Sequence, residues 1–563
     1  MDPGFVERHW SDLPNLARLR DRGSFSRLET TTPPQSPSAW STFITGLDPA
    51  QHGVFDFVER DPVTQRTYLS MAGTIPPRFH FPIGPYDLPL SRSRVVSLRK
   101  GKAFWQTLEE HGIPATMIRM PVNYPPVASG EALAGMGVPD LQGTEGTFSY
   151  YTDDPGDPPR SVSGGEIYRA NVVEGRAALR IEGPPNSLRR DRRATTADLL
   201  VDVDPAQPFA RLTIGDSVAI VREGQWSEWM PVEFPLIPHL VSAHGIVRVF
   251  AKQLHPRFEV YVSPVNVDPA SPDLPISQPA HQSRDIAARI GRFYTLGIPE
   301  DTSAMRQGVF DLPQFLAQTR LVLDDERRLL NDSLDRFSEG LLFFYFSSVD
   351  QNSHMLWGQH DDDLLKVYRA VDSAIGEVVR RRPSAELMVM SDHGFTSFDR
   401  AVDLNHWLQQ EGLLRTNAYA LGLNALYVRG GGAEHRALIA RIRAGLLALR
   451  DPANGRAPIE TVVETQVTGP NADHAPDLIV GYAPGYRVSW QTANGGAGEV
   501  TFSDNTDAWI ADHCINATDV PGVLFTTRKI HPVNPRIKDL PVSLLALFGI
   551  APNPGMEGHS VYR

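Results

Sequence analysis

The sequence predicts an α/β fold in which a mostly parallel sheet is flanked by helices. Apolar runs typical of buried strands alternate with amphipathic stretches typical of helices, which is the pattern of βα crossovers. Examples are a helix over 102–111 followed by a strand over 115–119, and a strand over 341–346 followed by a helix over 364–381. The strands 341–346 and 386–390 lead into stretches that contain Asp and His. Because α/β sheets bind ligands at the carboxyl ends of their strands, these stretches indicate a site.

Composition narrows the class of protein. The chain has 563 residues, enough for one large α/β domain with an insertion or for roughly two to four ordinary domains. Its hydrophobic content of 41% and charged content of 21% are those of a soluble globular protein. The net charge of −12 argues against a general nucleic-acid binder. No apolar run is long enough for a transmembrane helix, and no signal peptide is visible, which favours a cytoplasmic location for the chain as written.

The first part of the chain is predicted to contain a helix and several strands, one of which ends in a polar pair of residues. A helix is expected over 13–22 and a strand over 24–30, with Gly23 between them. The pair Asn123-Tyr124 follows the strand at 115–119, and two prolines come directly after the pair. The pair therefore lies at the end of a strand. Asn123 and Tyr124 are candidates for substrate contact, with a simple turn as the alternative.

The segment from Thr32 to Leu47 predicts a loop that enters a short helix with a hydroxyl at its start. Two prolines end any preceding element, Ser36 is suited to cap a helix, and Pro37 fits its first turn. Gly46 then ends the helix. A helix start attracts an anion, so Ser36 is either a nucleophile beside a phosphate or an ordinary N-cap serine.

Three stretches further along the chain combine Asp with His. They are Asp350 to His354, Asp392-His393 and Asp512-His513-Cys514. The first two follow predicted strands, and together they offer the nitrogen and oxygen ligands that zinc accepts. Each stretch alone also suits a helix cap or a loop histidine, but all three together indicate a metal site. Cys514 is the only cysteine, so no intramolecular disulfide exists, and we interpret it as packing near His513.

The middle of the chain has a different pattern. Short β-like runs separated by turn signals occupy residues 160–270, which predicts an antiparallel insertion, either a sandwich or a cap. The basic run 189–193 suits an anionic ligand or a solvated loop. We therefore expect a core in two parts, 1–155 and 281–563, separated by a β-rich insertion at 156–280.

The second core part returns to helices and strands. Helical patterns cover 315–330, 433–450 and 540–548, and a strand is expected over 521–525. His513 lies in the polar loop before that strand.

With these motifs in this order, the chain resembles the alkaline phosphatase superfamily, in its type I phosphodiesterase/nucleotide pyrophosphatase branch. The resemblance extends from Leu13-Pro14-Asn15-Leu16 to Met556-Glu557-Gly558-His559-Ser560. In that family a Thr or Ser precedes a Thr-Gly pair by nine positions, and Ser36 precedes Thr45-Gly46 by that spacing. The resemblance implies an alkaline-phosphatase-like sheet and a site for two divalent metal ions of the zinc type.

The same resemblance implies a ligand for each position. One metal ion would be held by Asp350, His354 and His513. The second would be held by Asp392, His393, the Ser36 oxygen and an aspartate at the end of an N-terminal strand.

That N-terminal strand is not found in the sequence as given. Family members usually open with an apolar strand that ends in the ligand aspartate, whereas this sequence starts at Met1-Asp2, just past it. We expect that the first strand is missing because the start is assigned too late or the sequence is trimmed. Asp2 matches the second, non-ligand acidic position, although it could substitute for the absent ligand.

The resemblance implies a metal-dependent hydrolase of a small phosphate ester, a phosphodiester or a nucleotide pyrophosphate, with a phosphoseryl intermediate on Ser36. A phosphomonoesterase of the same superfamily is an alternative. A catalytically impaired binding protein that lacks one metal ligand is another, and the β insertion leaves room for a lipid- or carbohydrate-binding module. A sulfatase does not fit, because Pro37 follows Ser36 directly and Trp40 stands where an Arg is needed.

Overall fold

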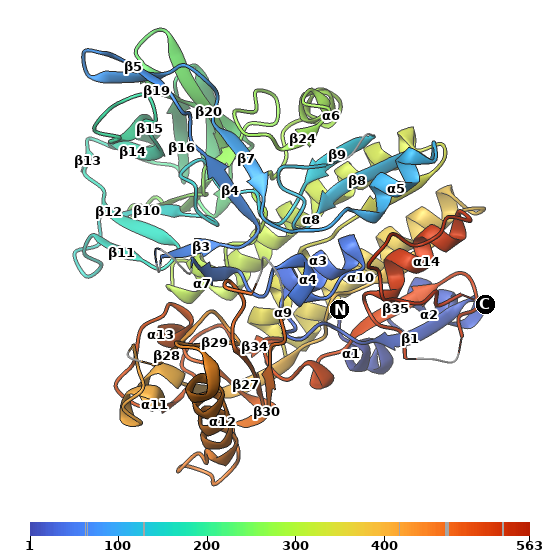
Figure 1. Cartoon of the computed structure of the whole chain (residues 1–563). Helices are drawn as coiled ribbons and strands as arrows, with labels where there is room; N and C mark the ends of the chain where they lie inside the picture. Colours follow the sequence, from blue (N-terminus) through green and yellow to red (C-terminus); the bar gives the residue numbers. More distant parts are fainter. Residues whose placement is uncertain are drawn as a thin grey trace.

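The computed structural model describes residues 1–61, 64, 66–127, 130–415, 417–467, 472–531 and 534–562. Helices and sheets alternate over these residues, so the fold is mixed α/β (Figure 1). The helices are α1 (Pro3–Arg8), α2 (Pro14–Arg22), α3 (Ser36–Thr45), α4 (Pro49–His52), α5 (Phe104–Glu110), α6 (Gln282–Ile290), α7 (Thr302–Arg306), α8 (Leu312–Arg336), α9 (Ser348–Leu356), α10 (Asp361–Arg381), α11 (Leu404–Gln410), α12 (Gly432–Ala448), α13 (Trp490–Ala493) and α14 (Asp539–Leu547).

Two sheets supply the core strands. The first has the order β24 (Ser277–Gln278), β9 (Glu131–Ala134), β8 (Ala115–Met120) and β25 (Leu341–Phe344). Strand β8 is parallel to both β9 and β25, whereas β24 is antiparallel to β9. The second has the order β1 (Ser24–Leu28), β35 (Gly522–Thr526) and β26 (Met388–Met390), with both pairings antiparallel.

The expectation of a mostly parallel sheet therefore needs correction, because the described core strands form one mixed sheet and one antiparallel sheet. The reason lies in β35. This strand follows the loop that carries His513, so it starts near the site and runs away from it. Strand β26 runs toward the site and ends before Asp392, which makes the β26–β35 pair antiparallel.

Helix α3 carries Ser36 and is buried along its whole length. Gln35, in extended conformation, occupies the N-cap, and Ser36 is the first helical residue, so the expected cap role of Ser36 is wrong. Gly46 ends the helix at φ 68°, a conformation that favours glycine. The apolar face of α3 packs on the core strands through Trp40 and Phe343, whose ring centroids lie 5.9 Å apart.

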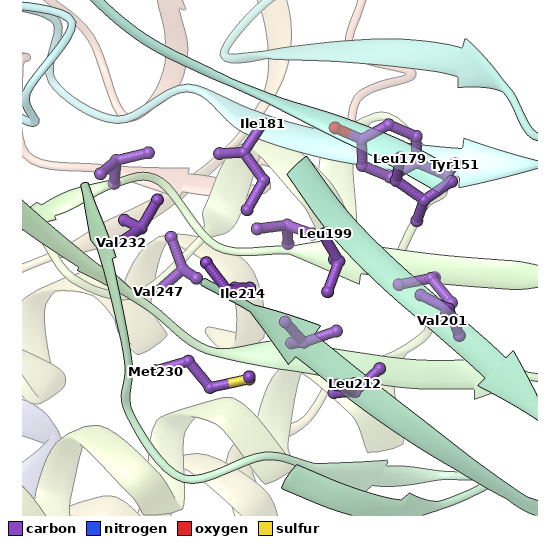
Figure 2. Close-up of a cluster of buried hydrophobic side chains, with 14 of the residues drawn as sticks. Tyr151, Leu179, Ile181, Leu199, Val201, Leu212, Ile214, Met230, Val232 and Val247 are labelled. Carbon is purple, nitrogen blue, oxygen red and sulfur yellow. The ribbon is translucent and has the colours of Figure 1, made fainter. Parts of the chain in front are cut away.

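Antiparallel strands fill most of the region between residues 160 and 270. One sheet consists of β13 (Val172–Val173), β14 (Arg176–Pro185), β15 (Ala194–Val203), β16 (Phe209–Ile214) and β17 (Ser217–Arg222). Another consists of β19 (Met230–Ile237), β20 (Val241–Val247) and β23 (Asn266–Val267). Buried and exposed positions alternate along β14, and its buried side chains join a shared apolar core (Figure 2). These strands gather at one end of the molecule (Figure 1).

A third sheet takes most of its strands from the same region, and it contains both parallel and antiparallel pairs. Its order is β11 (Arg160–Val162), β12 (Gly165–Arg169), β10 (Phe148–Thr152), β22 (Glu259–Val262), β21 (Val249–Gln253) and β18 (Gln225–Trp226). Short strands that pair two by two precede this sheet in the chain. They are β2 (Val58–Arg60), β3 (Thr67–Leu69), β4 (Ala72–Ile75), β5 (His80–Ile83), β6 (Tyr86–Pro89) and β7 (Arg94–Ser97).

The last third of the chain adds two further sheets. They are built from β28 (Ala418–Leu421), β29 (Ala425–Val428), β31 (Leu478–Tyr482) and β30 (Ile459–Glu464), and from β27 (Thr396–Val402), β32 (Gly485–Val488), β33 (Phe502–Asp504) and β34 (Ala511–Asp512). Among the helices that the structure describes, none combines the length and apolar character needed to span a membrane.

Candidate active site

The predicted site residues come together from four segments of the chain. Ser36 Oγ at the start of α3 lies 2.9 Å from His393 Nε2, which follows β26. The same nitrogen lies 3.3 Å from Asp392 Oδ2 and 3.7 Å from Asp350 Oδ1. In α9, His354 Nε2 lies 3.8 Å from Asp350 Oδ2. The sequence motifs therefore belong to one continuous site.

Backbone carbonyls orient the three histidines. The Nδ1 atoms of His354 and His513 lie 2.8 Å from the carbonyl oxygens of Ala511 and Pro34, and His393 Nδ1 lies 3.1 Å from that of Gly394. A nitrogen that faces a carbonyl carries the proton, so Nε2 of each ring keeps its lone pair. The His393 and His513 rings stack with centroids 3.4 Å apart. All three imidazoles are therefore set to act as metal ligands.

The carboxylates also fit a cation. One oxygen of Asp350 and one of Asp392 are buried and have no hydrogen-bond partner among the described residues. Burial raises the pKa of Asp350 to about 6, and it also raises the pKa of Asp392. The ligand atoms of Asp350, His354 and His513 all lie within 4.8 Å of one another. Buried carboxylates without a partner are costly, and a divalent cation between these groups would remove that cost.

Asp2 is engaged elsewhere. Its Oδ1 accepts the Phe5 N–H at 2.8 Å and so caps α1, while Oδ2 accepts the Phe395 N–H at 3.5 Å. Both oxygens therefore have backbone partners, and Asp2 is a helix cap in this structure.

Asp512 fixes the loop that carries His513. Its Oδ1 accepts the backbone N–H groups of His513 at 2.8 Å and Cys514 at 3.0 Å, and its Oδ2 pairs with the buried Arg487. Burial alone would raise the pKa of Asp512, but Arg487 and the nearby histidines hold it well below its usual range. Burial raises the pKa of the Cys514 thiol, and the negative charge of Asp512 raises it further. The thiol therefore stays protonated, and a protonated thiol is a poor nucleophile.

A second buried carboxylate holds the start of α9. Glu326 of α8 accepts the Ser347 N–H at 2.9 Å, and the hydroxyls of Ser347 and Ser348 at 3.0 and 3.2 Å. Arg119 lies 3.7 Å from the same carboxylate. This contact positions the helix turn that carries Asp350. Glu326 was not predicted from the sequence, where its only signal is that it is a carboxylate in the middle of an amphipathic helix.

A cavity of about 630 Å³ opens beside these groups. Ser36, Asp350, His354 and His513 line it. Further lining residues are Asp56, Phe57, Glu145, Glu300, Asp301, Arg306, Arg487, Trp490, Trp509 and Asp512. The cavity is large enough for a small organic ester, so it is the candidate substrate pocket.

Asn123 and Tyr124 do not line this cavity. Both are buried, Asn123 Oδ1 accepts the Val127 N–H at 3.1 Å, and Tyr124 packs in the apolar core of the β-rich region. The structure thus gives them a turn and packing role rather than a place beside the substrate.

A serine hydroxyl, carboxylates and imidazole nitrogens gather at strand ends of a mixed α/β fold, and this arrangement defines a class of protein, the mixed α/β proteins with a cluster of candidate metal ligands. Within that class, the chain belongs to the type I phosphodiesterase/nucleotide pyrophosphatase family, whose model matches residues 1–176 and 261–503. It is therefore a phosphohydrolase of the phosphodiesterase/pyrophosphatase type, and the resemblance read from the sequence is confirmed. Residues 177–260 and 504–563 lie outside the match. The first stretch holds most of β14 and all of β15–β21, and the second holds His513.

Two kinds of solved structure are similar to the chain. Phosphonoacetate hydrolase from Sinorhizobium meliloti 1021 in complex with phosphonoacetate has a TM-score of 0.47 and 12% identity, and the match covers 97% of this chain and 93% of that one. Murine ectonucleotide pyrophosphatase/phosphodiesterase 5 has a TM-score of 0.41 and 10% identity, with the same coverage of 97% and 93%. No curated protein sequence matches the chain.

Proposed function

We propose that the chain hydrolyses a small phosphodiester or pyrophosphate through a covalent intermediate on Ser36, at a site that holds two divalent cations of the zinc type. The observation that carries the proposal is the 2.9 Å contact of Ser36 Oγ with His393 Nε2, beside two carboxylates with buried, unpartnered oxygens. In this proposal residues 1–155 and 281–563 form the catalytic core and residues 156–280 an insertion.

Each residue has a chemical task. Asp350, His354 and His513 would hold one cation, and Asp392, His393 and Ser36 the other. Bound cations would supply positive charge that lowers the pKa of the Ser36 hydroxyl and neutralises the phosphoryl oxygens. Ser36 Oγ attacks phosphorus as its proton passes to solvent water, the bond from phosphorus to the leaving oxygen breaks in line, and the released alkoxide takes up a proton from water. Free N–H groups in the first turn of α3 face the phosphoryl oxygens, and water then cleaves the Ser36 ester.

The charges around the cavity favour a diester over a monoester. Among the described lining residues the cationic side chains are Arg306 and Arg487. Arg306 donates to Asp507 at 2.7, 2.9 and 3.1 Å, and Arg487 is paired with Asp512. Glu145 and Glu300 line the same wall, and burial raises the pKa of both side chains, to about 8 for Glu300. A diester carries one negative charge and a monoester close to two, so a wall without a free cation among its described residues suits the diester better.

Replacing the nucleophile tests the proposal. Ser36→Ala should lower kcat for bis(p-nitrophenyl) phosphate by about 10³-fold or more, because it removes the hydroxyl that forms the covalent intermediate. Bound zinc, measured by elemental analysis, should remain nearly unchanged. The matched control is Ser38→Ala, since Ser38 is buried in the same helix and its hydroxyl has no partner among the described residues.

Three results would count against the proposal. Activity of Ser36→Ala near that of the unmodified chain would remove Ser36 from the mechanism. Faster turnover of p-nitrophenyl phosphate than of the diester would identify a monoesterase. Binding of the diester without turnover by the metal-loaded, unmodified chain would identify the impaired binding protein.

A further inference from the structure

Residues 72–97 form an arm, which lies between β3 and α5 in the chain. Strands β4 and β7 pair at its base, with Ile75 opposite Arg94, and strands β5 and β6 pair at its tip. In Figure 1 β5 lies at an outer end of the molecule, whereas α9 lies near its centre. Every residue of β5 is exposed, so the tip of the arm stands out into solvent.

One face of the hairpin β5–β6 is apolar. Residues that lie opposite each other in an antiparallel pair share a face, and successive residues of a strand alternate between the two faces. The register, extended by the Leu90 N–H that donates to the Phe79 carbonyl at 2.8 Å, places six apolar side chains on the same face. They are Phe79, Phe81, Ile83, Tyr86, Leu88 and Leu90.

This apolar face is open to solvent. Phe79 is 60% exposed, Leu90 is 68% exposed, and Phe81 and Ile83 are also more than half exposed. Large apolar side chains that are exposed singly are common, but a continuous strip of them indicates an interaction surface.

The free edge of β5 does not suit a partner that adds a strand. The Asp87 N–H donates outward, to the Leu188 carbonyl at 2.8 Å, so the backbone groups of Pro82, which lies opposite Asp87, also point away from the hairpin. Pro82 has no N–H, and it occupies a position where an added strand would need a donor. The apolar face, rather than the edge, is therefore the surface that a partner can use.

A basic loop, residues 186–193, lies along β6 on the other side of the hairpin. The Arg190 N–H donates to the Pro85 carbonyl at 3.2 Å, and the Arg189 guanidinium lies 5.8 Å from the centre of the Tyr86 ring. The arm and this loop together contain seven arginines and two aspartates, with no lysine or glutamate. They are therefore strongly positive in a chain whose net charge is −12.

Most of these arginines are available to a ligand. The two aspartates are already paired, Asp191 with Arg189 at 2.7 Å and Asp87 with His80 at 3.4 Å. The other six arginines are exposed and form no ion pair within the described part of the chain: Arg78, Arg92, Arg94, Arg190, Arg192 and Arg193. Exposed arginines beside an apolar strip match a surface that is anionic outside and apolar beneath, as an anionic lipid bilayer is.

We propose that the arm docks the protein on an anionic lipid bilayer. The apolar face of β5–β6 enters the layer of lipid headgroups, and the six exposed arginines contact lipid phosphate groups. A second copy of the chain would also cover the apolar face. However, a symmetric contact would bring the same arginines together, and their repulsion disfavours it.

Cosedimentation of the full chain with phospholipid vesicles tests the proposal. The chain should bind vesicles with about 30% phosphatidylserine at least about 10-fold more tightly than neutral phosphatidylcholine vesicles. Two arm variants should each weaken binding to the anionic vesicles by about 10-fold or more. One combines Phe79→Ser with Phe81→Ser, and the other combines Arg190→Gln, Arg192→Gln and Arg193→Gln.

The matched control replaces exposed apolar residues outside the arm, Leu447→Ser with Val500→Ser, and should bind like the unmodified chain. All the substituted positions are exposed, so the Tm of each variant should stay unchanged. None of these measurements depends on turnover, and they therefore stand apart from the test of Ser36.

Three outcomes would overturn the inference. One is that the unmodified chain does not sediment with anionic vesicles. Another is that both arm variants, with unchanged Tm, bind these vesicles as tightly as the unmodified chain does. The third is a dimer in sedimentation velocity experiments that Phe79→Ser with Phe81→Ser abolishes, without any binding to vesicles, because the apolar face would then join two copies of the chain.

Discussion

At the scale of single residues, burial decides the charge of the acidic groups beside the cavity. Glu59 is buried next to Asp56, and its oxygens accept the Phe55 N–H at 2.8 Å and the Tyr68 hydroxyl at 3.0 Å. Burial raises the pKa of Glu59 to about 7, against these two hydrogen bonds, which lower it. The folded chain therefore holds the Glu59 proton over a pH range in which the unfolded chain has lost it.

The sign of the effect on stability follows from that difference. Because the folded state binds more protons between pH 4.5 and 7, stability falls as pH rises through this window. Relative to Glu59→Gln, the unmodified chain should lose about 3 kcal/mol of unfolding free energy between pH 4.5 and 7.5. Urea unfolding at a series of pH values measures this loss.

The exposed Glu499 supplies the control. Glu499→Gln should leave the pH dependence of the unmodified chain unchanged. A parallel pH dependence of Glu59→Gln and the unmodified chain would show that Glu59 ionises normally in the fold.

Residue chemistry also explains how far the site could be predicted. Short sequence motifs contain Ser36, Asp350, Asp392 and His513. The residue types of these motifs are enough to indicate a nucleophile and metal ligands. The support from Glu326 could not be predicted, because it comes from a different helix and depends on how α8 packs against the start of α9.

At the scale of elements, helix α2 depends on a cap from another helix. Its N-cap residue Leu13 offers no side-chain acceptor. Instead Asp372 of α10 accepts the N–H of Leu16 at 2.8 Å and of Asn15 at 3.1 Å. Sequence patterns predicted the helix, but this cap lies 357 residues away along the chain, out of reach of local pattern analysis.

Asp372→Ala should therefore destabilise the protein by about 2 to 3 kcal/mol, because it leaves buried N–H groups unpaired. Denaturant unfolding measures the change. Ser373→Ala, at the exposed neighbouring position, should have almost no effect. If the two variants were equally stable, the contact would be of no consequence for the fold.

Strand direction is a second feature of the elements that the sequence alone did not predict. The apolar runs predicted β25, β26 and β35 as strands, since composition and length suffice for that. Pairing order and direction depend on long-range contacts, which is why one mixed and one antiparallel core sheet were not predicted.

At the scale of the whole molecule, the proposed metal ligands connect distant parts of the chain. Helix α9, the end of β26 and the loop after β34 each contribute to the site. A ligand that binds only the folded state stabilises it, by about 2.7 kcal/mol at a hundredfold excess over Kd. Zinc added to the chelator-treated protein should therefore raise its Tm.

His354→Ala should reduce or abolish this rise in Tm, because one ligand is lost. His80→Ala, on the exposed strand β5, should retain it in full. An equal rise in both variants, measured by calorimetry, would place the stabilising zinc elsewhere.

The central claim is that Ser36 forms a covalent bond to phosphorus. Rapid quenching of the metal-loaded chain with bis(p-nitrophenyl) phosphate, followed by proteolysis and mass spectrometry, tests it most directly. The account predicts a p-nitrophenylphosphoryl adduct on Ser36 that forms within one turnover and is absent from Ser36→Ala. Steady turnover without an adduct on Ser36, or with the adduct on another residue, would contradict it.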